Sequence, residues 1–137
     1  MKLEIFRTLW GYTASKAQAL EELLHAGFDG MEARLPLDAR ERAEFKAFLQ
    51  ANRLGYISTI FTAYDVLPDQ SASPTLHLHD LDRKLSWAAE LGPRFVNVLA
   101  GNDRWALPQQ VEFFGQALEL ARRLHDATEQ HLLCSRL

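Results

Sequence analysis

The stretch LGPRFVNVLAGNDRW (residues 91–105) contains a complete passage from the end of a helix through a strand into a loop. Gly92 and Pro93 close the preceding helical pattern, because glycine suits a helix C-terminus and proline cannot continue a helix. The next residues, RFVNVLAG, are rich in aliphatic and β-branched types, which predicts a strand. A polar segment, NDRW, follows. The stretch therefore predicts a β-strand whose carboxyl end opens into a polar loop.

The same alternation of strand and helix extends over most of the chain. Strands are predicted at residues 3–10, 31–35, 56–62 and 94–101, and a helical pattern follows each of them, the last at about 108–125. Strict alternation is typical of parallel strands with right-handed crossovers and helices outside the sheet. The predicted fold class is α/β, with four consecutive βα units.

Local signals mark the helix ends and faces. Thr13 or Ser15 can cap the first helix, and Gln18 completes a capping-box pattern with Ser15. Ser73 followed by Pro74 predicts the start of the third helix after a loop of about eleven residues, AYDVLPDQSAS. Apolar spacing predicts which side of the last helix faces the core. That side consists of Val111, Phe114, Leu118 and Ala121.

Composition narrows the class of protein. A chain of 137 residues fits one domain, and 47% hydrophobic with 24% charged residues is ordinary for a globular protein. A net charge of -3 gives no electrostatic reason to expect nucleic acid, and no stretch approaches the ~18 apolar residues of a membrane span. Cys134 is the only cysteine, so an internal disulfide or a multi-cysteine metal site is excluded. We expect a cytoplasmic protein with neither nucleic-acid nor membrane partners.

Polar residues alternate with apolar ones along the predicted strands. Met31, Ala33 and Leu35 point toward the helices, so Glu32 and Arg34 point to the opposite face. Strands buried on both faces are normally continuous apolar runs, so an inner face that is polar favours a binding site. The alternative is an internal salt bridge of Glu32, to Arg34 or to a neighbour, that only orders the interior. The residues expected on the inner face also include Thr8, Trp10 and Asn97.

The order of motifs resembles a known family. The segments FRTLWG, GFDGMEARLP, AAELGP, RFVNVLAGNDRW and FFGQALELARRL occur in the order and spacing of the xylose isomerase-like TIM barrels, the sugar phosphate isomerase/epimerase superfamily. The resemblance covers residues 3 to about 125, and its most specific part is residues 91–105. It implies a (β/α)8 barrel of about 250 residues, of which this chain is the N-terminal half.

The resemblance also implies a divalent metal such as manganese or magnesium in complete relatives, held mainly by the second half of the barrel. The segment matching the fifth strand is EQHLLCSRL, where Glu129 precedes the apolar run and nothing acidic follows it. The third and fourth strands end in Phe61-Thr62 and Leu99-Ala100, which are not metal ligands. No metal ligand and no cofactor is therefore assigned to this chain.

Relatives of this kind catalyse metal-assisted isomerisation of sugars or keto-acids, so a small molecule of that class is the expected ligand. We expect this chain alone to be inactive. The alternative is a non-catalytic module that binds a small ligand or assembles with itself. Trp105 either stacks on a sugar face or caps the barrel as a loop tryptophan. The candidate substrate-binding residues are Trp10, Glu32, Arg34, Asn97, Asp103 and Trp105.

A half barrel leaves sheet edges open. Residues 1–137 are expected to form a single partial barrel with an atypical tail at 125–137. Two copies can close an eight-stranded barrel as a homodimer, or the strands can rearrange into an open doubly wound sheet. A third interpretation is that the tail is read from a shifted frame in a truncated product.

Overall fold

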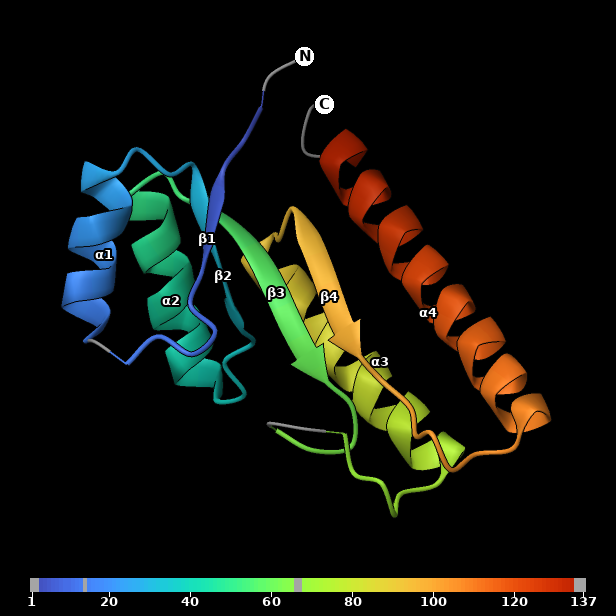
Figure 1. Cartoon of the computed structure of the whole chain (residues 1–137). Coiled ribbons are helices and arrows are strands. Elements are labelled where there is room, and N and C mark those ends of the chain that lie inside the picture. The colour runs from blue at the N-terminus through green and yellow to red at the C-terminus, as the bar shows by residue number, and fades with distance from the viewer. Residues whose placement is uncertain (1–2, 14, 66–67, 135–137) are drawn as a thin grey trace. The chain divides into compact units, whose positions relative to one another are not determined.

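The computed structural model describes residues 3–13, 15–65 and 68–134 and has the predicted alternation of strands and helices (Figure 1). The strands form one sheet in the order β1-β2-β3-β4. The elements are β1 (Phe6–Thr8), α1 (Lys16–His25), β2 (Gly30–Arg34), α2 (Ala39–Ala51), β3 (Gly55–Phe61), α3 (Pro74–Leu91), β4 (Phe95–Leu99) and α4 (Leu107–Cys134). The predicted α/β class with four βα units is confirmed.

The strands run parallel. β1 pairs with β2 in parallel, as does β2 with β3. For β3 and β4, the N–H of Arg94 bonds to the carbonyl of Tyr56 at the beginning of the two strands, and the N–H of Thr62 bonds to that of Leu99 at their end. The first residues of β3 therefore lie beside those of β4, and the last residues beside the last, as parallel strands require.

The helix starts follow the capping signals in the sequence. The Oγ of Ser15 accepts the N–H of Gln18 at 3.2 Å, and Gln18 Oε1 accepts the N–H of Ser15 at 3.1 Å, which is the predicted capping box. Asp38 caps α2 by accepting two backbone N–H groups. The Oγ of Ser73 accepts the N–H of Leu76 at 3.2 Å in the first turn of α3. Of the two candidate caps for α1, Ser15 is confirmed.

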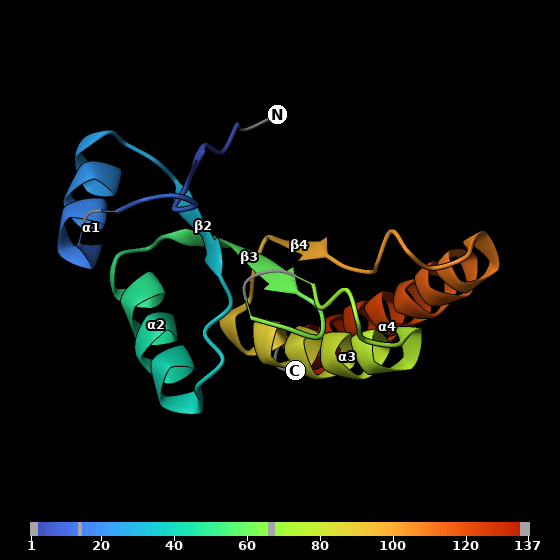
Figure 2. The ribbon, with the colours of Figure 1, turned by 60° about the horizontal axis from the view of Figure 1, so that its bottom comes forward.

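The described chain divides into two compact units, Met1–Thr59 with Glu90–Asn97 and Ile60–Ala89 with Val98–Leu137. Figure 2 shows α1 and α2 in the first and α3 and α4 in the second. In the first unit, Arg7 on β1 forms an ion pair with Glu22 on α1 at 2.7 Å. The ring of Tyr56 on β3 meets that of Phe45 on α2 edge-on at 5.1 Å. These contacts identify the face of the sheet that α1 and α2 cover.

On the opposite face of the sheet in the first unit, a phenyl ring lies over two glycines. Phe6, Gly30 and Gly55 occupy the same register position on β1, β2 and β3. A Cβ on Gly30 would lie 2.5 Å from the Phe6 ring, and one on Gly55 would lie 2.9 Å from it. Glycine is needed at both positions because any side chain would displace this ring. The ring forms an apolar floor at the amino ends of the strands.

The second unit is built around α3. Of the apolar residues along this helix, Leu81, Leu85 and Ala88 are buried and Leu78 is half-buried. His77 on the same helix is fully buried and meets the rings of Trp105 and Phe113 edge-on, at 4.9 and 6.3 Å.

The predicted core side of α4 is wrong. Phe113 and Leu120 are the buried side chains, and the predicted ones are exposed. The physical reason is that β4 is the last strand of the sheet in the described chain, so no further strand covers that side of α4. The exposed residues are Val111, Phe114, Leu118 and Ala121.

The end of α4 also differs from the prediction. The helix continues to Cys134 rather than ending near His125, so the segment compared with a fifth strand is helical up to that residue. Residues 135–137 of the predicted atypical tail lie outside the described residues. No helix in the described part of the chain is long and apolar enough to cross a membrane.

Candidate ligand-binding face

Three strands of the first unit bring polar side chains together on the face opposite α1 and α2. Glu32 lies on β2, Thr59 on β3 and Asn97 on β4. The Oε1 atom of Glu32 accepts a hydrogen bond from Asn97 Nδ2 at 2.6 Å and another from Thr59 Oγ1 at 3.3 Å. The alternation that placed Glu32 and Asn97 on one face thus brings them into contact. We call these three residues the Glu32 cluster.

Arg34 is the next residue on the same face of β2. It is exposed and lies in register with Thr59. Among the described residues, no ion pair joins Arg34 to Glu32, so the alternative of an internal salt bridge between them is not what the structure has. Its guanidinium is therefore available to a carboxylate or phosphate group of a ligand.

Trp10 follows β1 at the same edge of the sheet. Thr8 is in register with Glu32, and its Oγ1 accepts the N–H of Trp10 at 3.2 Å. This bond turns the chain after the strand, and the Trp10 side chain is left 58% exposed. An exposed indole beside polar side chains has the surface that stacks on the apolar face of a sugar ring.

Asp103 and Trp105 belong to the loop after β4 in the second unit. Asp103 is exposed. Trp105 is 9% exposed, and its ring packs against His77 and, at 5.2 Å, against Phe113. The loop is shaped by Asn102, whose amide donates to the Gln70 carbonyl and whose Oδ1 accepts the N–H of Arg104. Packing within the protein explains the position of the Trp105 side chain. A ligand contact of Asp103 or of Trp105 stays a prediction.

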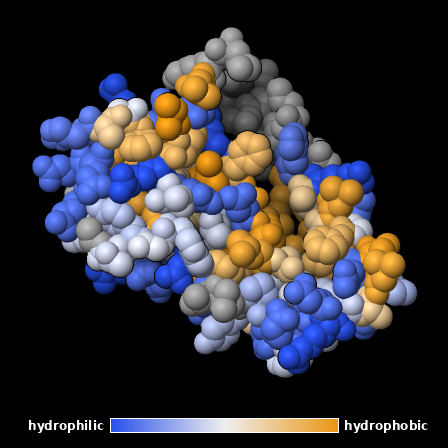
Figure 3. Space-filling view, viewed as in Figure 1, coloured by the Kyte–Doolittle hydropathy of each residue, from blue (hydrophilic) through white to orange (hydrophobic). Residues whose placement is uncertain are grey.

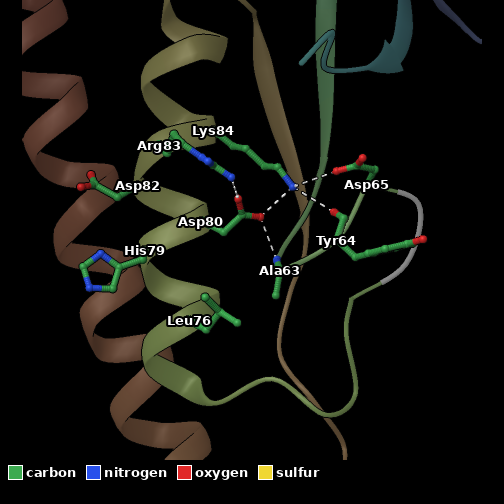
Figure 4. A pocket seen from close by; sticks show the side chains of 9 residues that line it. All are labelled: Ala63, Tyr64, Asp65, Leu76, His79, Asp80, Asp82, Arg83 and Lys84. Atoms are coloured by element: carbon green, nitrogen blue, oxygen red, sulfur yellow. Dashed lines mark hydrogen bonds and ion pairs between the residues drawn. The ribbon is translucent and has the colours of Figure 1, made fainter. Parts of the chain in front are cut away.

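Sequence reasoning missed a charged cluster after β3 in the second unit, shown in Figure 4. Lys84 is 3% exposed, and its Nζ donates to the carbonyls of Phe61 at 2.8 Å and Tyr64 at 2.9 Å. The same nitrogen forms an ion pair with Asp80 Oδ2 at 2.6 Å. Three acceptors thus surround an ammonium group with three hydrogens. We call Asp80 and Lys84 with these backbone partners the Asp80 cluster.

Asp80 holds the beginning of the loop after β3. Its carboxylate accepts the N–H of Ala63 at 2.8 Å and forms an ion pair with Arg83 at 2.6 Å. Ala63 has a positive φ of 60°, a conformation that costs energy for alanine and that this bond helps to hold. Burial raises the pKa of Asp80, but the hydrogen bonds from Lys84 and Arg83, the charge of Lys84 and the Ala63 N–H outweigh it. The pKa is therefore below its ordinary value.

A second buried contact joins α3 to the end of β3. His77 Nε2 lies 2.9 Å from the carbonyl of Asp69, which can only accept, so this nitrogen donates. Nδ1 of the neutral ring is then the acceptor for Thr62 Oγ1, 2.6 Å away. Both ring nitrogens are used within the protein, so His77 serves the packing of this unit.

The described residues do not fit a divalent metal. No three or more histidine, cysteine, aspartate or glutamate side chains group closely enough in the described part of the chain to hold one. The Glu32 cluster offers one carboxylate with an amide and a hydroxyl, fewer strong ligands than such ions require. The side chain of Glu129 lies outside the described part.

No protein-family model matches the chain, and no curated protein matches it. Among solved structures, it is similar to a sugar phosphate isomerase/epimerase from Parabacteroides distasonis, with a TM-score of 0.68 and 12% sequence identity. The alignment covers 90% of this chain and 51% of that one, so this chain spans about half the length of that protein. The predicted fold is confirmed: the chain has the fold of half of a barrel of this kind.

Proposed function

We propose that this chain provides one half of a ligand-binding barrel of the sugar isomerase/epimerase type. The proposed ligand is a sugar or a keto-acid. The observation that carries the proposal is the Glu32 cluster, in which three strands contribute a carboxylate, a hydroxyl and an amide to a face that α1 and α2 leave open. In parallel α/β barrels, ligands bind where the carboxyl ends of the strands meet.

The chemistry of this face suits a polyhydroxylated ligand. A glutamate carboxylate accepts hydrogen bonds from sugar hydroxyls, and an amide both donates and accepts. Arg34 is one register step further along the strand, where it can pair with a phosphate or carboxylate of the ligand. Trp10 adds an aromatic surface at the end of β1. The face therefore offers polar groups for hydroxyls, a cation for an anionic group and a ring for stacking.

We propose that the chain alone does not catalyse isomerisation. Moving a proton between two carbons requires a base at one carbon and a group that stabilises the negative charge on the neighbouring oxygen. Glu32 could serve as the base, but the described residues offer no metal site to stabilise that oxygen. The missing groups would come from whatever completes the barrel.

A non-catalytic module that binds ligands or assembles with itself is the second candidate. The exposed apolar residues of α4, such as Phe114 and Leu118, favour it because a helix in water is normally polar on its outer side. The two candidates differ in turnover. The first predicts catalysis once a partner that carries the missing groups completes the barrel, and the second predicts none in any assembly.

The experiment is a titration followed by backbone amide chemical shifts, with D-fructose, D-fructose 6-phosphate and pyruvate as probes. We expect at least one probe to shift the amides of Glu32, Arg34 and Asn97. Shifts confined to the loop after β3, or none with any probe, would overturn the proposed site. Isomerase assays with manganese or magnesium are expected to stay at the enzyme-free rate. Metal-dependent turnover by the pure chain would refute the proposed inactivity.

A further inference from the structure

The helix α4 carries an exposed apolar stripe within the second unit. Its residues are Leu107, Val111, Phe114, Leu118 and Ala121. They are spaced four, three, four and three residues apart, which places them on one side of the helix, as in a helix that packs against a partner. Hydrophobic side chains gather on the side of α4 turned to the viewer in Figure 3. We call this set the α4 stripe.

Comparison with α3 shows what is missing beside the stripe. Each of the two helices follows a parallel strand along the chain, but the apolar residues of α3 are buried, Leu81 at 3% and Ala88 at 1% exposed. After β3 the sheet continues with β4, whereas after β4 it has no further strand in the described chain. A βα helix covers its own strand and the next one, so the α4 stripe marks the place of a next strand.

We infer that a second copy of this chain docks at this place, with its β1 beside β4 and under the α4 stripe. This inference rests on the proposal that the chain works as half of a barrel. The similar solved structure is about twice as long, since this chain covers 51% of it, so two copies supply the matching number of βα units. Docking of each copy on the other forms two identical seams and closes the ring.

The chain itself carries a strand edge suited to this position. β1 is the first strand in the sheet order, so the edge facing away from β2 has no strand in the described part. Ile5 lies two residues before Arg7, which faces α1, so its side chain points to the helix side of the sheet. That side chain is 52% exposed, and Leu3 before it is exposed too. A β1 placed beside β4 would therefore bring apolar side chains against the stripe.

The first measurement is the mass of the pure chain by sedimentation equilibrium over a range of concentrations. We expect twice the 15.6 kDa of one chain. Leu118→Glu should raise the dissociation constant of the dimer by on the order of a hundredfold, because each dimer loses two leucine contacts. Leu76→Glu is the matched control, since Leu76 on α3 is 52% exposed and Leu118 is 51% exposed. A monomeric wild type, or equal effects of the two variants, would overturn the inference.

A mixing experiment identifies the docked segment. Ile5→Lys should also dissociate the dimer, while its backbone bonds to Asp29 are kept. Mixing the Ile5→Lys and Leu118→Glu chains should restore a two-chain mass, because one seam then pairs lysine with glutamate and the other is unchanged. If Ile5→Lys leaves the dimer intact, or if mixing restores nothing, β1 is not the segment that covers α4.

The dimer measurements and the ligand titration test different proposals, so one proposal can be refuted while the other stands. A monomer that still binds a probe through Glu32 would refute the docking and leave the ligand face standing. A dimer that binds none of the probes would refute the ligand face and leave the docking standing. Circular dichroism of each variant establishes that a lost dimer is not a lost fold, and an unfolded Leu118→Glu chain would contradict the exposure of this residue.

Discussion

The Glu32 cluster and the Asp80 cluster both centre on a carboxylate, but only the Glu32 cluster leaves hydrogen-bonding capacity unused. Lys84 is buried and all three of its hydrogens have acceptors within the protein. Asn97 is exposed, and the second carboxylate oxygen of Glu32 accepts no hydrogen bond from the described part of the chain. A buried cluster with every group satisfied stabilises a fold, whereas an open one retains capacity for a ligand.

The largest expected effect is on stability in the Asp80 cluster. Asp80→Asn should lower the free energy of unfolding by about 3 kcal/mol, because it removes the carboxylate 2.6 Å from the buried charge of Lys84 and leaves only the exposed Asp65, 4.0 Å away. Denaturant unfolding at neutral pH measures this. Asp82→Asn is the matched control, since Asp82 is exposed on the same helix, and it should change stability by less than about 0.5 kcal/mol. Similar values for the two variants would remove the distinction between the clusters.

The pH dependence of stability tests whether the ionised carboxylate of Asp80 is what stabilises the Asp80 cluster. The pKa of Asp80 is lowered in the folded chain, so its contribution to stability is present above the ordinary value of 3.8. That contribution is lost as the pH falls through the lowered value. The wild type and Asp80→Asn should therefore differ most at neutral pH and less as the pH falls below about 4. A difference that stays constant from pH 7 to pH 2 would show that the ionised carboxylate is not what stabilises the loop.

The smallest expected stability effect belongs to the Glu32 cluster. Glu32→Gln keeps the size of the side chain and a carbonyl oxygen for Asn97, so the free energy of unfolding should change by less than about 1 kcal/mol. Glu21→Gln on the exposed surface of α1 gives the control for loss of one negative charge. If Glu32→Gln destabilises the chain as much as Asp80→Asn, the Glu32 cluster is structural and the proposed ligand face loses its support.

Local signals in the sequence carried the prediction of the elements. Ser15 with Gln18 and Ser73 with Pro74 predicted two helix starts, because capping depends on residues next to each other in the chain. Strand alternation likewise predicted that Glu32 and Asn97 share a face. Each of these predictions needed only a residue and its near neighbours.

Tertiary context decided the rest. The apolar spacing of α4 predicted a core side at Val111, Phe114 and Leu118, and this was wrong because spacing shows that residues share a side of a helix but not whether a strand covers that side. Asp80 and Lys84 were missed because aspartate and lysine are normally exposed. Their four-residue spacing along the buried side of α3, beside Leu81 and Leu85, was the signal that could have revealed them. Trp105 lies in a loop, yet packing with His77 buries it.

The most direct test of the ligand face is the ratio of dissociation constants for D-fructose between Glu32→Gln and the wild type, measured by amide shifts at pH 7. D-fructose is uncharged, so removal of the carboxylate charge changes hydrogen bonding without changing attraction to an ion. We predict binding weaker by about tenfold in Glu32→Gln and unchanged in Glu21→Gln, since a hydrogen bond to a charged acceptor is worth about 1.5 kcal/mol or more. Equal dissociation constants for Glu32→Gln and the wild type would contradict the account.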